Sequence, residues 1–226
     1  MTNTLHRFGK PETLRDDYIV FAMASKGIND EGAVEKVRVF FRAALKHNPI
    51  NMGNAVINPL YRPEKDLTFL KLYFSGRKEK VAPETFISEI SALGTAAVVF
   101  DNRQTMADFL KELRDLDLGL SVNVSALIDD VRDVCGEIHL TPHSVEYSLP
   151  FQGDIDRLPE RDILSLTTMC GHGMIASNFA RKMVDGIREG RLERDQACRY
   201  MAKFCVCGVF NTTRALRILE TTVKGA

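Results

Sequence analysis

The chain has 226 residues, of which 45% are hydrophobic and 27% are charged, a composition typical of soluble globular proteins. Its 30 basic residues balance its 30 acidic residues, which excludes a strong overall attraction to nucleic acid or to an anionic membrane surface. No apolar run reaches the roughly 18 residues that a membrane-spanning helix needs, and the first seven residues carry no apolar signal core. We therefore expect a cytoplasmic protein whose thiols are reduced.

The first half of the chain predicts strands that alternate with helices. Residues 18–24 form a continuous apolar run of strand length, and a helical apolar pattern follows over residues 34–45. Between them, Ser25, Lys26 and Gly27 form a glycine turn before a helix N-terminus, where free N–H groups can bind an anion. These three residues are the predicted cofactor-binding position.

Residues 48–65 are rich in Asn and Pro and predict a long loop that acts as a lid or a subunit contact. The elements expected after it are strands at 67–74, 96–100, 120–124 and 143–149, and helices at 83–93, 104–116 and 125–136. This alternation is typical of an α/β fold with a mixed or parallel sheet covered by helices. An α+β arrangement of tandem ferredoxin-like units is the alternative, because the predicted elements have similar spacing over residues 67–100 and 119–149.

A change of architecture is predicted near residues 150–159, which are rich in Pro, Gly and Asp. No strand-length apolar run follows them. We therefore expect an α/β domain over residues 1–150 and an all-helical C-terminal region over residues 151–226.

Two short segments of this helical region concentrate its reactive side chains. Cys170 and His172 lie in the first, and Cys205 and Cys207 lie in the second. They are four soft or borderline ligands, the number that a closed tetrahedral site needs. If the helices between them form a hairpin, the chain returns and the two pairs meet. The sequence thus predicts a metal site that holds zinc or an iron–sulfur cluster, with the cluster favoured because several thiolates lie near glycine N–H groups.

A metal-free enzyme is the second hypothesis. Both segments end in glycine before a helical pattern, and a helix N-terminus favours a thiolate. Cys170 would then be the catalytic nucleophile or acid/base, with His172 or His143 as its partner. Residues 169–173, Met-Cys-Gly-His-Gly, also resemble a catalytic-cysteine segment of the proline racemase family. The resemblance implies a racemase- or lyase-like reaction in which Cys170 transfers a proton.

Three classes of function therefore stay open. A metal site is consistent with a redox or accessory role, and a metal-free thiolate with an enzyme. Buried structural cysteines would leave the helical region as an interaction module. The partners expected from these alternatives are an unknown small molecule, a redox partner or further copies of the chain in a homo-oligomer.

Overall fold

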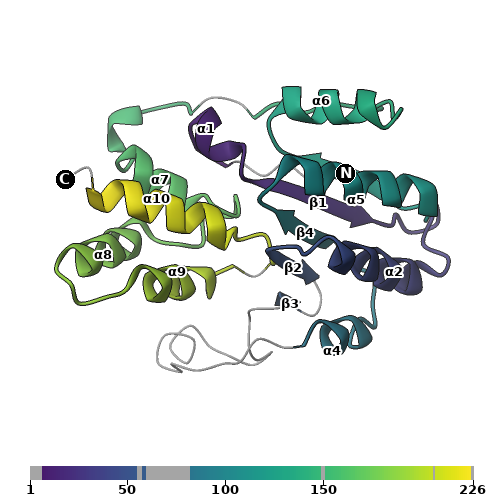
Figure 1. The fold of residues 1–226 in the computed structure, drawn as a ribbon, viewed down its shortest axis with the longest axis horizontal. Coiled ribbons are helices and arrows are strands. Elements are labelled where there is room, and N and C mark those ends of the chain that lie inside the picture. Colours follow the sequence, from purple (N-terminus) through teal and green to yellow (C-terminus); the bar gives the residue numbers. More distant parts are fainter. Residues whose placement is uncertain (1–6, 55–57, 60–81, 149–150, 206, 225–226) are drawn as a thin grey trace.

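The computed structural model describes residues 7–54, 58–59, 82–148, 151–205 and 207–224. At its centre is a sheet with the strand order β3-β2-β4-β1-β5 (Figure 1). The strands are β1 (Tyr18–Met23), β2 (Asn51–Asn54), β3 (Asn58–Pro59), β4 (Ala96–Phe100) and β5 (Ser121–Ser125). Each neighbouring pair in this order is antiparallel.

Helices alternate with the strands in the first part of the described chain, and further helices follow in the last part. Those of the first part are α1 (Pro11–Leu14), α2 (Ala33–Lys46), α4 (Pro83–Ser88), α5 (Arg103–Leu116) and α6 (Ile128–Glu137). After a short 3-10 turn, η1 (Ile155–Arg157), come α7 (Arg161–Thr167), α8 (Ser177–Arg188), α9 (Arg194–Ala202) and α10 (Thr212–Lys224). Beyond residue 159 the described residues contain helices and no strand, which confirms the predicted change of architecture.

Four of the five described strands form two interleaved βαβ units. Strands β1 and β2 are parallel to each other with β4 between them, and β4 and β5 are parallel with β1 between them. Helix α2 connects the first pair of strands and α5 connects the second. This is the ferredoxin-like arrangement. One such unit is present, and the described residues from 126 to 148 supply no strand for a second in tandem.

Alternate residues of the central strands enter two different cores. On β1, Val20 packs against α2 and α5, whereas Ile19 and Phe21 pack against the C-terminal helices. On β4, Val98 and Val99 divide in the same way. Figure 1 shows α7 to α10 gathered on one side of the sheet and α2 and α5 on the other. The C-terminal helices thus pack against one face of the sheet, and the two together enclose a hydrophobic core.

The predicted mixed or parallel sheet was wrong. Continuous apolar strands suggested parallel pairing, because parallel strands are usually buried on both faces. Here an antiparallel sheet has both faces buried, since helices from opposite ends of the chain cover it. The continuous apolar runs result from burial of both faces of the sheet, and they do not indicate whether neighbouring strands are parallel or antiparallel.

Several boundaries also differ from the predictions. Residues 51–54 form strand β2 where a loop was expected, and residues 143–148 form no strand. The helix predicted over 83–93 ends at Ser88, and Gly136 lies inside α6. The strand predicted at 67–74 lies outside the described residues.

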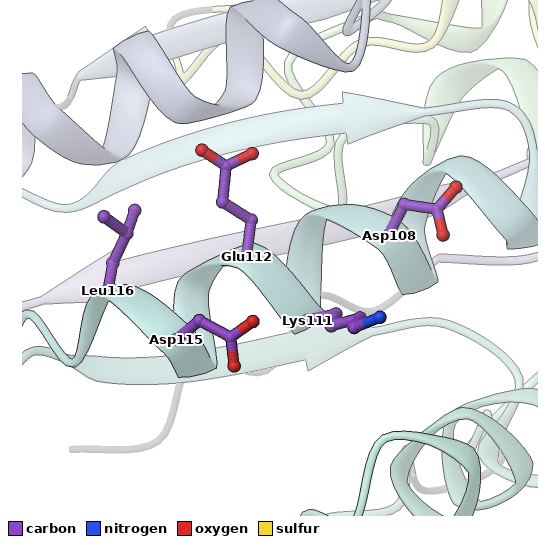
Figure 2. Close-up of a pocket in the computed structure, with 5 residues that line it drawn as sticks. All are labelled: Asp108, Lys111, Glu112, Asp115 and Leu116. Atoms are coloured by element: carbon purple, nitrogen blue, oxygen red, sulfur yellow. The ribbon is translucent and has the colours of Figure 1, made fainter.

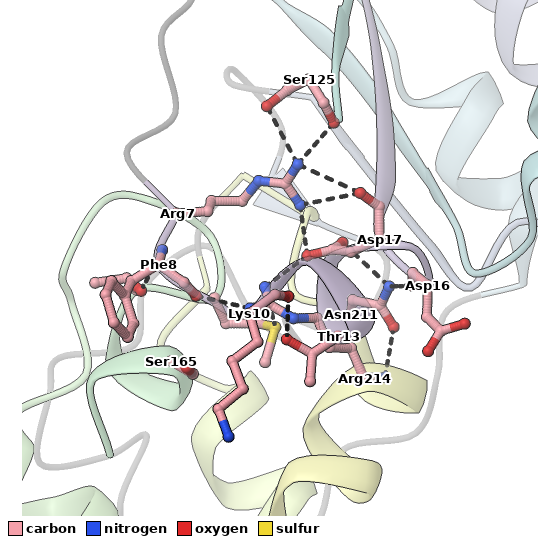
Figure 3. A network of polar contacts seen from close by, with 12 residues as sticks. Arg7, Phe8, Lys10, Thr13, Asp16, Asp17, Ser125, Ser165, Asn211 and Arg214 are labelled. Atoms are coloured by element: carbon pink, nitrogen blue, oxygen red, sulfur yellow. Dashed lines mark hydrogen bonds and ion pairs between the residues drawn. The ribbon is translucent and has the colours of Figure 1, made fainter. Parts of the chain in front are cut away.

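Buried ion pairs and hydrogen bonds attach the segment before β1 to the rest of the fold (Figure 3). The fully buried Asp17 carboxylate lies between two guanidinium groups, that of Arg7 and that of Arg214 on α10, the latter at 2.8 Å. Arg7 also donates to the carbonyl of Ser125 on β5 at 2.7 Å, and Arg214 donates to the carbonyl of Phe8 at 2.7 Å. We call Arg7, Asp17 and Arg214 the buried clasp. It connects the edge strand β5 with α10.

Candidate metal centre

A helical hairpin brings the two cysteine segments together. Cys170 follows the end of α7, and α8 and α9 then pack against each other, joined by the short turn 189–193. The chain emerging from α9 returns Cys205 and Cys207 to the first segment. This confirms the predicted meeting of residues 35 positions apart in sequence.

The donor atoms converge closely. The sulfurs of Cys170 and Cys207 and a ring nitrogen of His172 all lie within 4.8 Å of one another. Nδ1 of His172 is 3.4 Å from Sγ of Cys207, and the sulfurs of Cys205 and Cys207 are 3.7 Å apart. Such a cluster could hold a metal ion.

These separations match the edges of a small coordination tetrahedron. Metal–sulfur bonds of about 2.3 Å and metal–nitrogen bonds of about 2.0 Å place two sulfurs about 3.8 Å apart, and a sulfur and a nitrogen about 3.5 Å apart. The observed 3.7 Å and 3.4 Å lie close to both values. Cys170, His172 and Cys207 thus form a three-residue group that could hold one ion, and Cys205 lies beside this group, next to Cys207.

The site is buried on one side and open on the other. Cys170 and Cys205 are each 1% exposed, Cys207 is half-buried and His172 is exposed. An ion can enter past the imidazole, whereas the two inner sulfurs are shielded from large reagents. This asymmetry suits a metal ligand better than a nucleophile that must meet a substrate.

The three cysteine thiols shift the pKa values of one another in opposite directions. Thiol hydrogen bonds from Cys170 and Cys207, together with the backbone N–H groups of Cys207 and Phe210, hold the pKa of Cys205 well below its usual range. The neighbouring Cys205 thiolate in turn raises the pKa of Cys170 to about 11. Hydrogen bonds to Cys170 and Cys205 likewise raise the pKa of Cys207. A second or third thiolate needs a cation to compensate its charge.

The second segment rests directly on the sheet. A Cβ added to Gly53 of β2 would lie 2.4 Å from the carbonyl oxygen of Cys207, and one added to Gly208 would lie 2.5 Å from the backbone of Gly53. Gly208 also has a φ of +72°, a left-handed conformation that favours glycine. The side chain of Asn51 donates to the carbonyl of Phe210 at 3.2 Å. Strand β2 therefore fixes the position of the Cys207 turn.

These supporting residues were missed by sequence reasoning. Asn51 and Gly53 lie in the stretch 48–65, whose Asn and Pro content predicts a loop. The signal that could have found them is a glycine between apolar and polar strand positions, which often marks a close backbone approach.

The buried clasp also reaches the first segment. The N–H of Phe8 donates to Oγ1 of Thr168 at 3.0 Å, and Nη1 of Arg214 contacts the sulfur of Met169 at 3.6 Å. Thr168 and Met169 immediately precede Cys170. The clasp and strand β2 thus hold the two halves of the site from different sides.

The expected helix N-terminus at Cys170 was wrong. Cys170 lies three residues beyond the end of α7, and α8 begins only at Ser177. The dipole argument for a reactive thiolate therefore does not apply to it. The His172 ring lies within hydrogen-bonding distance of the Cys207 sulfur, and the exposed His143 is not part of the group found among the described residues. A catalytic role for Cys170 and His172 remains an untested prediction.

In the turn predicted to bind a cofactor, nearby side chains already accept hydrogen bonds from the backbone N–H groups. The N–H of Ser25 donates to Oδ1 of Asn29 at 2.6 Å, and the N–H of Gly27 donates to Oδ1 of Asp30 at 2.9 Å. An anion would have to displace these contacts and approach a carboxylate. Binding at Ser25, Lys26 and Gly27 remains a prediction without structural support.

Comparisons with protein-family models, curated proteins and solved structures find no match to this chain. None of the described helices is both long and apolar enough to cross a bilayer. The function must therefore be inferred from the side chains of the site itself.

Proposed function

We propose that this protein binds a single zinc ion through Cys170, His172, Cys205 and Cys207. The observation that carries the proposal is the set of short donor separations, 3.4 Å between sulfur and nitrogen and 3.7 Å between two sulfurs. Three thiolates and one imidazole form a closed Cys3His set, which is typical of structural zinc sites.

The same spacing favours one ion over the iron–sulfur cluster that the sequence suggested. In a cluster, several irons and sulfides lie between the cysteines, and the protein sulfurs must stand farther apart to reach different irons. Here Cys170, His172 and Cys207 already crowd around one point. Zinc binds both thiolate and imidazole ligands, and in structural sites it is almost always tetrahedral.

The role that follows is structural. The ion would join the end of α7 to the connection between α9 and α10, and so tie the helical region to the sheet through Gly53. Metal binding in such a site contributes directly to folding, because the unfolded chain has no preformed site. On this proposal the protein is a metal-stabilised accessory or interaction protein, and the metal-free enzyme is the alternative.

Elemental analysis of protein purified without oxygen tests the proposal. We expect about one zinc per chain and no bound iron. Replacing zinc by cobalt(II) should give the visible absorption of a tetrahedral thiolate complex. The variant Cys207→Ala should lose the ion.

Cys198→Ala is the matched control. Cys198 is buried in α9, where burial raises the pKa of its thiol to about 12, and it is not in the cluster. This variant should retain full metal content. Iron with labile sulfide would contradict the zinc assignment, and wild-type protein that binds no metal at all would refute the proposed function.

A further inference from the structure

A hollow of about 320 Å³ lies over α5, outside the metal centre. Figure 2 shows that its lining side chains all come from this helix; they are Asp108, Lys111, Glu112, Asp115 and Leu116. Each of the three carboxylates already contacts a side chain of α5 or α2. The hollow therefore offers little to a ligand, whereas the outer edge of the sheet has backbone groups that still lack partners.

Strand β5 lies at one end of the strand order, next to β1. It contains neither Lys nor Pro, which natural sheets often place on an edge strand to prevent pairing with another chain. None of its five residues is fully buried, and Val122 is 39% exposed. The strand is therefore an unprotected edge.

The hydrogen bonds inside the sheet show which way the backbone groups of each strand point. Along a strand, the N–H and C=O of successive residues point alternately to its two neighbours. The carbonyl of Val99 on β4 accepts from the N–H of Ile50, just before β2. Val99 therefore points to β2, and the adjacent Val98 points to β1. Since Val98 is paired with Val20, the backbone groups of Val20 point to β4.

The same alternation gives the direction of the backbone groups on β5. Phe21, which follows Val20, points to β5 and is paired with Asn123. The N–H and C=O of Asn123 therefore point to β1, and those of Val122 and Val124 point away from the sheet. No hydrogen bond to these four outward groups is present within the part of the chain that the structure describes. Arg7 contacts the carbonyl of Ser125, which points to β1 as Asn123 does, so it leaves the outer edge free.

The sequence of this edge strand is self-complementary. Residues 121–125 are Ser-Val-Asn-Val-Ser, which reads the same in both directions. An antiparallel partner with the same sequence, related by a twofold axis at Asn123, places Val122 opposite Val124 of the partner subunit. Both pairs of valines then exchange two backbone hydrogen bonds, which satisfies all the outward groups. We propose that two copies of this chain pair along β5 in this register and form one continuous sheet.

Asn123 favours a second copy over an unrelated strand. Its Nδ2 is buried and has no hydrogen-bond partner within the described ranges. In the proposed register the two asparagines form the central non-hydrogen-bonded pair, whose Cα atoms lie about 4.5 Å apart. Rotation of each side chain then lets its amide donate to Oδ1 of the other. The exposed Val122 side chain is covered by the neighbouring valine in the same pairing.

Sedimentation equilibrium of the zinc-loaded full chain tests the proposal. Two paired five-residue strands bury less than a standard interface of about 1,600 Å², so we expect a reversible dimer with a Kd on the order of 10 µM. A chain that stays monomeric at about 200 µM, twentyfold above this Kd, would overturn the inference. The pairing does not involve the metal ligands, and the zinc content of the same samples tests the proposed metal site separately.

Variants of Val122 locate the interface. Val122→Pro removes an outward N–H and leaves the ladder with β1 intact, so it should raise the dimer Kd by at least about tenfold. Val122→Thr, which retains the N–H and the branched side chain, is the matched control and should dimerise like the wild type. Val122→Lys also retains the N–H but places a cation beside Val124 of the partner subunit, and it should weaken the dimer even if proline disturbs the strand. Thermal unfolding checks that each variant is folded. Dimerisation of both the Pro and the Lys variants with wild-type affinity would refute the β5 interface.

Cysteine crosslinking tests the register. Asn123→Cys places two thiols at the twofold axis, at a Cα separation that a disulfide can span, and mild oxidation should link two chains through this position. Ser121→Cys is the matched control, because in this register the two copies of residue 121 are about 14 Å apart and cannot be linked to each other. Peptide mapping separates these crosslinks from any at the native cysteines. Linkage through position 121 and not through position 123 would contradict the proposed twofold axis.

Discussion

Two glycines decide whether the Cys207 turn can lie where it does. Gly53 and Gly208 touch through their backbones, and no side chain larger than hydrogen fits between them. Such contacts cannot be relieved by a rotamer change, since backbone atoms lie on both sides. Cys207, one of the proposed metal ligands, is thus positioned by residues outside the proposed ligand set.

We expect Gly53→Ala to lower the free energy of unfolding by about 1–3 kcal/mol, the usual cost of overpacking, and to weaken zinc binding. Denaturant unfolding and competition with a chelator measure the two effects. Gly136→Ala is the matched control, because nothing lies within 4 Å of a Cβ at that position in α6. It should stabilise the protein by about 0.5–1 kcal/mol. Equal behaviour of the two variants would refute the proposed contact.

Zinc binding should release protons. The pKa of Cys170 is raised to about 11 and that of Cys207 is raised as well, whereas the pKa of Cys205 is lowered well below its usual range. Near pH 8 both raised thiols carry protons that the ion must displace, so affinity increases as the pH rises. We expect about two protons released per zinc and a roughly 100-fold gain in affinity per pH unit. Calorimetry in buffers of different ionisation enthalpy counts these protons, and a count near zero would contradict the coupled thiols.

Among the elements, the buried clasp binds segments from both ends of the chain. The fully buried Asp17 forms ion pairs with two guanidinium groups, that of Arg7 before β1 and that of Arg214 on α10. Burial lowers the pKa of Arg214, and the nearby Asp17 carboxylate opposes this shift. The clasp is therefore a point where the N-terminal segment, the sheet and the last helix depend on one another.

Asp17→Asn should destabilise the fold by about 3–5 kcal/mol, because it leaves two buried cations without their anion. Chemical denaturation measures the change. The control is Asp129→Asn, which breaks the exposed pair of Asp129 with Arg132 at 3.8 Å and should alter stability far less. A similar small effect at both positions would show that the clasp does not stabilise the fold.

At the scale of the whole molecule, the sheet separates two cores, and the proposed metal site lies in one of them. The core under α2 and α5 contains none of the four proposed ligands, whereas the core under the C-terminal helices includes Cys170 and Cys205. Metal removal should therefore act mainly on one side of the sheet.

We expect chelation to accelerate amide hydrogen exchange in α7 to α10 and to leave α2 and α5 largely protected. Local opening follows the elements that lose contacts first, and the proposed ion joins only the C-terminal helices to the sheet. Exchange mass spectrometry of zinc-loaded and chelated protein compares the two sides. Uniform loss of protection would mean that the two cores unfold together.

The sequence alone determined the elements with strong periodicity and the chemistry of the site. The apolar run at Tyr18 and the capping Asn102, whose side chain accepts from two backbone N–H groups of α5, are local signals. The predicted set of Cys170, His172, Cys205 and Cys207 followed from residue type and from the length of two helices, which is also local information.

Only the tertiary structure decided the strand directions, the place of β2 and the direction in which each thiol pKa is shifted. Strand pairing depends on contacts between residues far apart in sequence, and double burial gave β1 and β4 the pattern of parallel strands. The Asn51–Asn54 strand is buried because the Cys207 turn lies on Gly53, which no local preference can reveal. The pKa of Cys205 is lowered because hydrogen bonds from the other thiols and from backbone amides converge on it in space.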